Sequence, residues 1–105
     1  MESLLLTQAD DGHTVAVRPG QPVLLRLLEN LSTGYVWRVA QAVPGLQELY
    51  EAAASGAVGS AGVRTFTFLA PAEPQDLAFH LVRDWTPEQV ERSFHCRLVP
   101  AAELV

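Results

Sequence analysis

Apolar and polar residues alternate along most of this chain, in short stretches bounded by Gly, Pro, Asn and Asp. Successive side chains of a β-strand point to opposite faces of a sheet, so a period of two predicts strands. In residues 23–28, for example, Val23, Leu25 and Leu27 share one face and Arg26 lies on the other. The stretches with this pattern are residues 13–18, 23–28, 35–39, 65–68, 77–82 and 94–98. Short, evenly spaced strands separated by turns predict an all-β sandwich.

Residues 46–54 do not follow this pattern. They are rich in strong helix formers, and Leu46, Leu49, Tyr50 and Ala53 recur at the spacing of one helix face. A sandwich nevertheless needs a strand here, because the preceding and following strands must be connected at opposite ends. The residues alone leave helix and strand both open.

Three connections between the predicted strands contain unusual residues. In a sandwich whose consecutive strands run in opposite directions, every second connection lies at the same end. If a strand occupies residues 46–51, the connections at 29–34, 52–62 and 83–89 share one end of the molecule, here called the rim. The rim is the candidate functional site. Its conspicuous residues are Asn30, Leu31, Ser32, Thr33, Gly34 and Tyr35, then Gly59, Ser60, Ala61 and Gly62, then Arg83, Asp84, Trp85, Thr86 and Pro87.

The first connection has the composition of a tight turn. Asn30 and the hydroxyls of Ser32 and Thr33 can bond to nearby backbone groups, and Gly34 can adopt a positive φ. By itself this composition is typical of an ordinary turn between strands.

The other two connections also allow more than one interpretation. No lysine follows the glycines of residues 59–62, so a flexible connection explains them better than a phosphate-binding loop does. Trp85 stands where strand alternation has already ended. Its indole either covers the core or is offered to a partner.

Composition and charge narrow the possible partners. The chain has 105 residues, 49% of them hydrophobic, so we expect one domain, residues 1–105, around a single core. Its seven basic residues are all Arg and are scattered, and the net charge is −5, so no basic run is available for nucleic acid. No apolar stretch reaches the about 20 residues of a membrane helix. The start of the chain lacks the basic leader of a secretory signal, which places the protein inside the cell unless a leader was removed.

An enzymatic or metal-binding role is not indicated, and we expect no cofactor. Cys96, the one cysteine, follows His95 on an alternating strand, so the two side chains face opposite sides and form no nucleophile–base pair. Cys96 instead shares a face with Phe94 and Leu98, which predicts a buried small hydrophobe. The remaining candidates have no metal-ligand spacing and are expected at turns or exposed positions: His13, His80, His95, Asp10, Asp11, Glu88 and Glu91.

Taken in order, the three connections resemble the motifs of the chagasin family of cysteine peptidase inhibitors. That family carries an Asn-Pro-Thr-Thr-Gly-Tyr/Phe loop, a Gly-x-Gly-Gly loop and an Arg-Pro-Trp loop. The counterparts here are Asn30-Leu31-Ser32-Thr33-Gly34-Tyr35 with Trp37, Gly59-Ser60-Ala61-Gly62, and Arg83-Asp84-Trp85. The resemblance spans nearly the whole chain. It implies an immunoglobulin-like β-sandwich of seven to eight strands with Greek-key connections, and a strand rather than a helix at 46–51.

The chain departs from this pattern at several rim positions. Leu31 and Asp84 stand where the family has proline, which removes two residues that stiffen a loop before binding. Ser32 replaces a threonine and keeps the hydroxyl. Ala61 replaces a glycine, so a positive φ there would be strained.

The resemblance implies a reversible inhibitor of papain-family cysteine peptidases that blocks the active-site cleft and does no chemistry itself. The loop of Thr33 would enter the cleft near the catalytic thiolate, Trp85 would lie on the aromatic wall of the primed side, and residues 59–62 would take the other flank. The alternative is a non-enzymatic immunoglobulin-like binding module that uses the same loops for another protein or ligand. In either case we expect a monomer.

Overall fold

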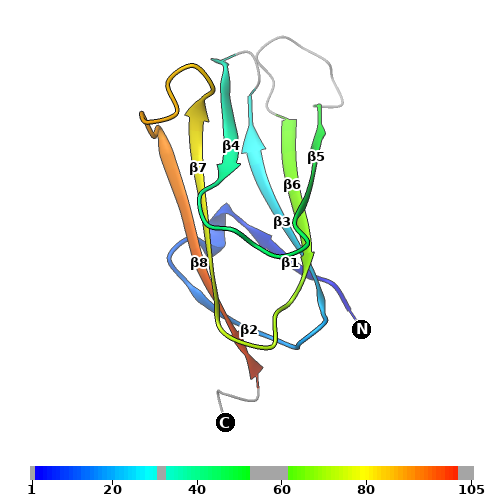
Figure 1. Ribbon diagram of the computed structural model, residues 1–105. Coiled ribbons are helices and arrows are strands. Elements are labelled where there is room, and N and C mark those ends of the chain that lie inside the picture. The colour runs from blue at the N-terminus through cyan, green and yellow to red at the C-terminus, as the bar shows by residue number, and fades with distance from the viewer. Residues whose placement is uncertain (1, 31–32, 53–61, 102–105) are drawn as a thin grey trace.

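Two β-sheets pack face to face in the computed structural model, which describes residues 2–30, 33–52 and 62–101 (Figure 1). The sheets have the strand orders β1-β3-β6-β5 and β2-β8-β7-β4. The elements are β1 (Leu4–Thr7), the 3-10 helix η1 (Gln8–Asp10), β2 (Thr14–Val17), β3 (Pro22–Glu29), β4 (Tyr35–Val39), β5 (Gln47–Glu51), β6 (Gly62–Leu69), β7 (Gln75–Arg83) and β8 (Arg92–Pro100). The predicted sandwich and its strand number are confirmed.

Consecutive strands run in opposite directions. The pairs β3–β6, β5–β6, β4–β7 and β7–β8 are antiparallel. The pairs β1–β3 and β2–β8 are parallel. The chain reverses direction between consecutive strands, so two strands separated by an even number of connections run the same way. The strand ends that flank the β3–β4, β5–β6 and β7–β8 connections therefore lie together, at the top of Figure 1.

The first and fifth strands show where local patterns mislead. β1 is not predicted by alternation, because Leu4, Leu5 and Leu6 form a continuous apolar run. β5 confirms the strand at 46–51 against its helix propensity, since it pairs with β6 along its whole length. A bilayer-spanning helix is absent from the part of the chain that the structure describes.

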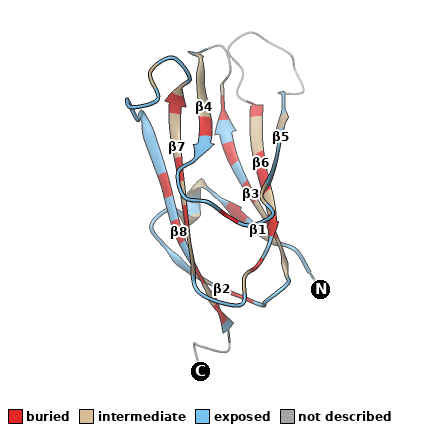
Figure 2. Cartoon of the chain, viewed as in Figure 1, coloured by how far each residue is buried: buried red, intermediate tan, exposed pale blue. Residues whose placement is uncertain are grey.

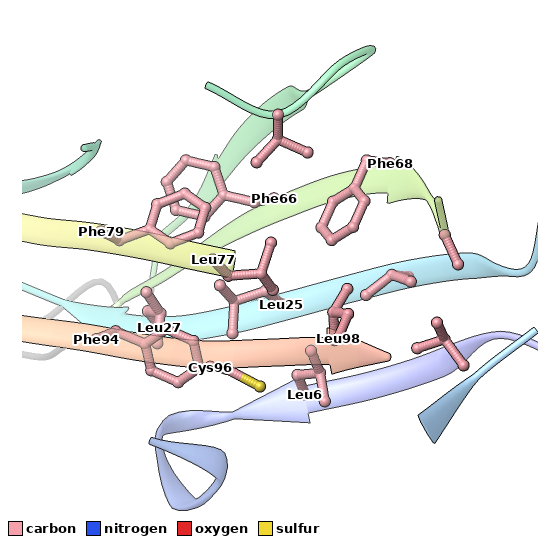
Figure 3. Close-up of a cluster of buried hydrophobic side chains, with 14 of the residues drawn as sticks. Leu6, Leu25, Leu27, Phe66, Phe68, Leu77, Phe79, Phe94, Cys96 and Leu98 are labelled. Carbon is pink, nitrogen blue, oxygen red and sulfur yellow. The ribbon is translucent and has the colours of Figure 1, made fainter. Parts of the chain in front are cut away.

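Buried residues occur along the strands of both sheets (Figure 2), and their side chains fill the space between the sheets (Figure 3). The rings of Phe66 on β6 and Phe79 on β7 have centroids 4.4 Å apart, so an aromatic contact joins the two sheets. Cys96 lies in this core as predicted, and its burial raises the pKa of the thiol to about 11.

A buried carboxylate joins the sheets at the rim. Glu29, the last residue of β3, is only 2% exposed and lies on the inward face of its strand. The Arg64 guanidinium donates from Nη2 to Glu29 Oε2 at 2.6 Å and from Nε to both carboxylate oxygens at 3.2 Å. The backbone N–H of Trp37, on β4 in the opposite sheet, donates to Oε1 at 2.7 Å. One carboxylate thus connects three strands.

Further contacts surround this carboxylate. Trp37 donates from its indole Nε1 to the Leu28 carbonyl at 2.9 Å, and the Tyr50 hydroxyl donates to the Glu29 carbonyl at 3.4 Å. The Arg64 guanidinium lies 5.1 Å from the centroid of the Tyr50 ring. The hydrogen bond to Glu29 raises the pKa of Arg64 above its ordinary value. The cluster of Glu29, Arg64, Trp37 and Tyr50 ties β3, β4, β5 and β6 together just below the rim.

We predict that Glu29→Gln destabilises the fold. The substitution keeps the side chain's shape but leaves the Arg64 guanidinium, 14% exposed, without its buried counter-charge. The free energy of unfolding measured by urea denaturation should fall by about 3 kcal/mol. Glu48→Gln is the matched control, because Glu48 lies 3.8 Å from the same guanidinium but is 46% exposed. The control should change stability by less than about 0.5 kcal/mol. Equal losses in the two variants would contradict the role of burial.

We also predict that Cys96 is chemically inert in the folded protein. A buried thiol with a raised pKa offers almost no thiolate at about pH 8. Titration with a disulfide reagent should detect no thiol in native buffer and one per chain in urea. Rapid reaction of the native protein would show that this part of the core opens readily.

Candidate functional site

The described parts of the predicted rim lie at one end of the sandwich. Cross-strand partners place them: Glu29 lies opposite Gly62, and Tyr35 lies opposite Arg83. The strand ends β3, β4, β5, β6 and β7 meet there in Figure 1. The predicted site residues outside the described ranges are Leu31, Ser32, Gly59, Ser60 and Ala61.

The described residues of the first connection, Asn30 and residues 33–35, are held by local bonds. The Thr33 backbone N–H and hydroxyl donate to the Asn30 carbonyl at 3.2 and 2.8 Å. The same hydroxyl accepts the Tyr35 N–H at 3.3 Å. Gly34 has φ +80°, a conformation that favours glycine. The bonding expected for the Thr33 hydroxyl and the positive φ expected for Gly34 are both present.

Trp85 is displayed on the surface and is not folded into the core. The residue is 68% exposed, whereas Trp37 is 1% exposed. The Trp85 indole lies directly over Gly34, where an added Cβ would stand 2.6 Å from the ring's Cη2 atom. Only glycine leaves room for this approach, so the first and third connections are in direct contact.

Arg83 joins the same two connections. Its Nε donates to the Thr33 carbonyl at 3.3 Å. Its guanidinium carbon lies 4.3 Å from the centroid of the Tyr35 ring and 5.7 Å from that of Trp85. Cation–π contacts of this kind hold the guanidinium between two aromatic rings.

The third connection is internally bonded as well. The Thr86 N–H donates to the Arg83 carbonyl at 3.0 Å and closes a tight turn with Asp84 and Trp85 at its centre. The Gln89 N–H donates to the Thr86 carbonyl at 3.0 Å. Arg38 on β4 forms an ion pair with Asp84, which has no signal in the sequence because the two residues are 46 positions apart.

Gly62 has a packing role. It is buried at the start of β6, and an added Cβ would collide with the Tyr50 ring and the Glu51 carbonyl. Of the four residues predicted at the second connection, Gly62 is the one that the structure describes, and it lies against Tyr50 of the Glu29 cluster.

The Glu29 cluster itself was missed by sequence reasoning, although a signal exists. Glu29 is in phase with the inward residues Leu25 and Leu27, and Arg64 is in phase with Phe66. Two opposite charges on inward strand positions indicate a buried ion pair. Their partnership becomes visible once β3 and β6 are known to be neighbours.

The described rim residues make a contact surface. Thr33, Arg83 and Asp84 are held in bonds within the rim, and the exposed indole stands beside them. Within the described ranges, the Thr33 hydroxyl is bonded to backbone groups of Asn30 and Tyr35 and is not paired with a base. Such an arrangement offers an ordered surface with an exposed ring.

Comparisons with solved structures show the same fold in a cysteine protease inhibitor and in two further proteins. The cysteine protease inhibitor EhICP2 from Entamoeba histolytica superposes with a TM-score of 0.79 at 22% identity, covering 95% of this chain and 96% of that one. Amebosin gives a TM-score of 0.73 at 24% identity, covering 95% and 98%. PbICP-C, solved in complex with falcipain-2, gives 0.59 at 13% identity, covering 95% and 99%.

Sequence comparison adds the family. A search among curated proteins finds no match. The family model for chagasin family peptidase inhibitor I42, however, matches residues 16–98, which include the first and third connections and most of the core. The members of this family are inhibitors of peptidases and not enzymes. The chain therefore belongs to the chagasin family of peptidase inhibitors.

Proposed function

We propose that this chain is a reversible inhibitor of papain-like cysteine peptidases, and that it blocks the active-site cleft with the connections at 30–35, 59–62 and 83–87. Family membership and the fold shared with cysteine protease inhibitors support this function. PbICP-C, a protein of the same fold, has been solved with falcipain-2 bound. The proposed partner of this chain is a peptidase of the same papain-like class.

The single observation that carries the proposal is the display of Trp85. A large ring that is 68% exposed and still rests on Gly34 and beside Arg83 is both available and held in place. Tryptophans of this kind are enriched among residues that dominate binding energy. We infer that the indole stacks on the aromatic wall of the primed side of the cleft.

Thr33 lies on the connection that we place at the centre of the proposed contact with the peptidase. Its hydroxyl is bonded to the Asn30 carbonyl and the Tyr35 N–H, so it shapes the turn and does not act as a nucleophile. We infer that this turn enters the cleft near the catalytic thiolate. The inhibitor does no chemistry there, because filling the cleft is enough to exclude the substrate.

The third contact is proposed for residues 59–62, through backbone groups that small residues leave accessible. A wedge of three connections should bury about 1,600 Å² in total, which is usual for complexes of proteases with inhibitors. The affinity would come from rigidity, because side chains and loops that are already ordered lose little entropy on binding. The bonds among Thr33, Arg83 and Trp85 supply that order.

We predict that Trp85→Ala weakens inhibition of papain by about 2 kcal/mol, which is about 30-fold in the inhibition constant. The reason is loss of the ring that stacks on the aromatic wall of the primed side. The measurement is a titration of papain with hydrolysis of a fluorogenic peptide as readout. Leu69→Ala is the matched control, because Leu69 is 65% exposed at the far end of β6. An unchanged inhibition constant for Trp85→Ala would reject this role of the indole.

We predict that Gly34→Ala weakens inhibition by about tenfold and stability by about 1 kcal/mol, because a Cβ would displace the indole and strain the positive φ. Gly20→Ala separates the two causes. Gly20 has φ +82°, lies at the opposite end of the sandwich and has nothing within 4 Å of the added Cβ. This control should lose similar stability and keep its inhibition constant. If both variants inhibited equally well, the contact between Gly34 and Trp85 would have no part in binding.

A further inference from the structure

The turn that carries Trp85 is held by a residue of another strand, Arg38 on β4. The hydrogen bond from the Thr86 N–H to the Arg83 carbonyl closes the turn. Asp84 is therefore the second residue of the turn. Proline is favoured at this position because its ring fixes φ in advance. Asp84 has no such ring, so the backbone beneath the indole needs another restraint.

The Asp84 carboxylate supplies that restraint through Arg38. Arg38 donates from Nη2 to Oδ2 at 3.0 Å, from Nη2 to Oδ1 at 3.1 Å and from Nε to Oδ1 at 3.2 Å. Two of the three guanidinium nitrogens and both carboxylate oxygens take part. This two-point geometry restricts rotation as well as distance, which a single contact does not.

The other end of the pair is fixed in a sheet. Arg38 lies on β4, where it is opposite His80 of β7. Exposed ion pairs contribute little in general, and the two side chains here are 45% and 64% exposed. Two-point Arg–carboxylate pairs between anchored segments are the exception, because less side-chain freedom is lost when the pair forms.

We propose that the Arg38–Asp84 ion pair positions Trp85 for binding, so that affinity for the peptidase depends on this pair and declines as salt screens it. The inference rests on the proposed inhibitory function. Arg38 and Asp84 are positioning residues, since they act through the turn. Without the pair, the turn would visit other conformations in the free inhibitor and would have to be ordered on binding.

The test compares Asp84→Asn, Arg38→Gln and the double variant in titrations of papain. Each single variant should raise the inhibition constant by about fivefold, and the double variant should raise it no further, because either change breaks the same pair. For the wild-type protein, the advantage over Asp84→Asn should shrink between about 50 mM and about 500 mM NaCl. Additive losses in the double variant, or an advantage that does not change with salt, would overturn the proposal.

Asp76→Asn is the matched control. Asp76 forms an ion pair with Arg97 at 3.1 Å, with side chains 35% and 48% exposed, near the opposite end of β7. Removing this pair should leave the inhibition constant within about twofold of wild type. An equal loss for Asp76→Asn would show that surface charge in general, and not the position of Trp85, determines affinity.

A second readout separates this inference from the proposed function. In protein labelled with 5-fluorotryptophan, the fluorine signals of Trp37 and Trp85 are distinguished by the Trp85→Phe variant. Asp84→Asn should change the line width and shift of the Trp85 signal and leave the buried Trp37 signal unchanged. If the wild-type protein failed to inhibit papain, the proposed function would be wrong. The change of the Trp85 fluorine signal in Asp84→Asn would still test whether the Arg38–Asp84 ion pair positions the indole. An unchanged Trp85 signal would overturn the positioning role even if inhibition were present.

Discussion

The rim depends on one buried negative charge, that of Glu29. A carboxylate in the core is tolerated only when every part of it is paired, and its partners here come from different strands. Arg64 provides the counter-charge from β6, and the Trp37 backbone provides an N–H from β4. β4 is an edge strand of its own sheet, so the carboxylate bonds a backbone group on the margin of that sheet. The end of β3 and the middle of β4 are consequently fixed to each other across the sandwich.

Close contacts connect the buried Glu29 cluster to the exposed residues of the rim. Because Tyr35 starts β4 and Arg83 ends β7 opposite it, the guanidinium can stack on the ring and still reach the Thr33 carbonyl. Gly34 then brings the backbone close enough for the Trp85 indole to rest on it. Exposure normally leaves a large side chain free to rotate. Here the indole is exposed on one side and supported on the other, which combines availability with low entropy of binding.

The fold could be predicted from the sequence more fully than the site. Period-two alternation identifies most strands and misses β1, where leucines lie on both faces. The helix propensity of β5 is overruled by pairing with β6, a long-range effect that no local pattern contains. At the site, the motifs place Trp85 and Thr33 correctly at one end. The partners of Glu29 and Asp84 depend on which strands become neighbours, so the roles of Arg64 and Arg38 emerge only from the three-dimensional arrangement.

Several polar groups of the rim are bonded within the protein and are less available to a partner. The Thr33 hydroxyl, the Arg83 Nε and the Asp84 carboxylate all bond within the protein, and Arg38 cancels the charge of Asp84. Among the described residues around the indole, the charge of Asp84 is thus paired, and the Arg83 guanidinium is a positive charge beside the ring. Discrimination by paired hydrogen bonds requires free donors and acceptors, whereas a ring and a turn of backbone select for the width and depth of a groove. In the proposed complex, the exposed indole and the turn at Thr33 would therefore select a partner by the shape of its cleft.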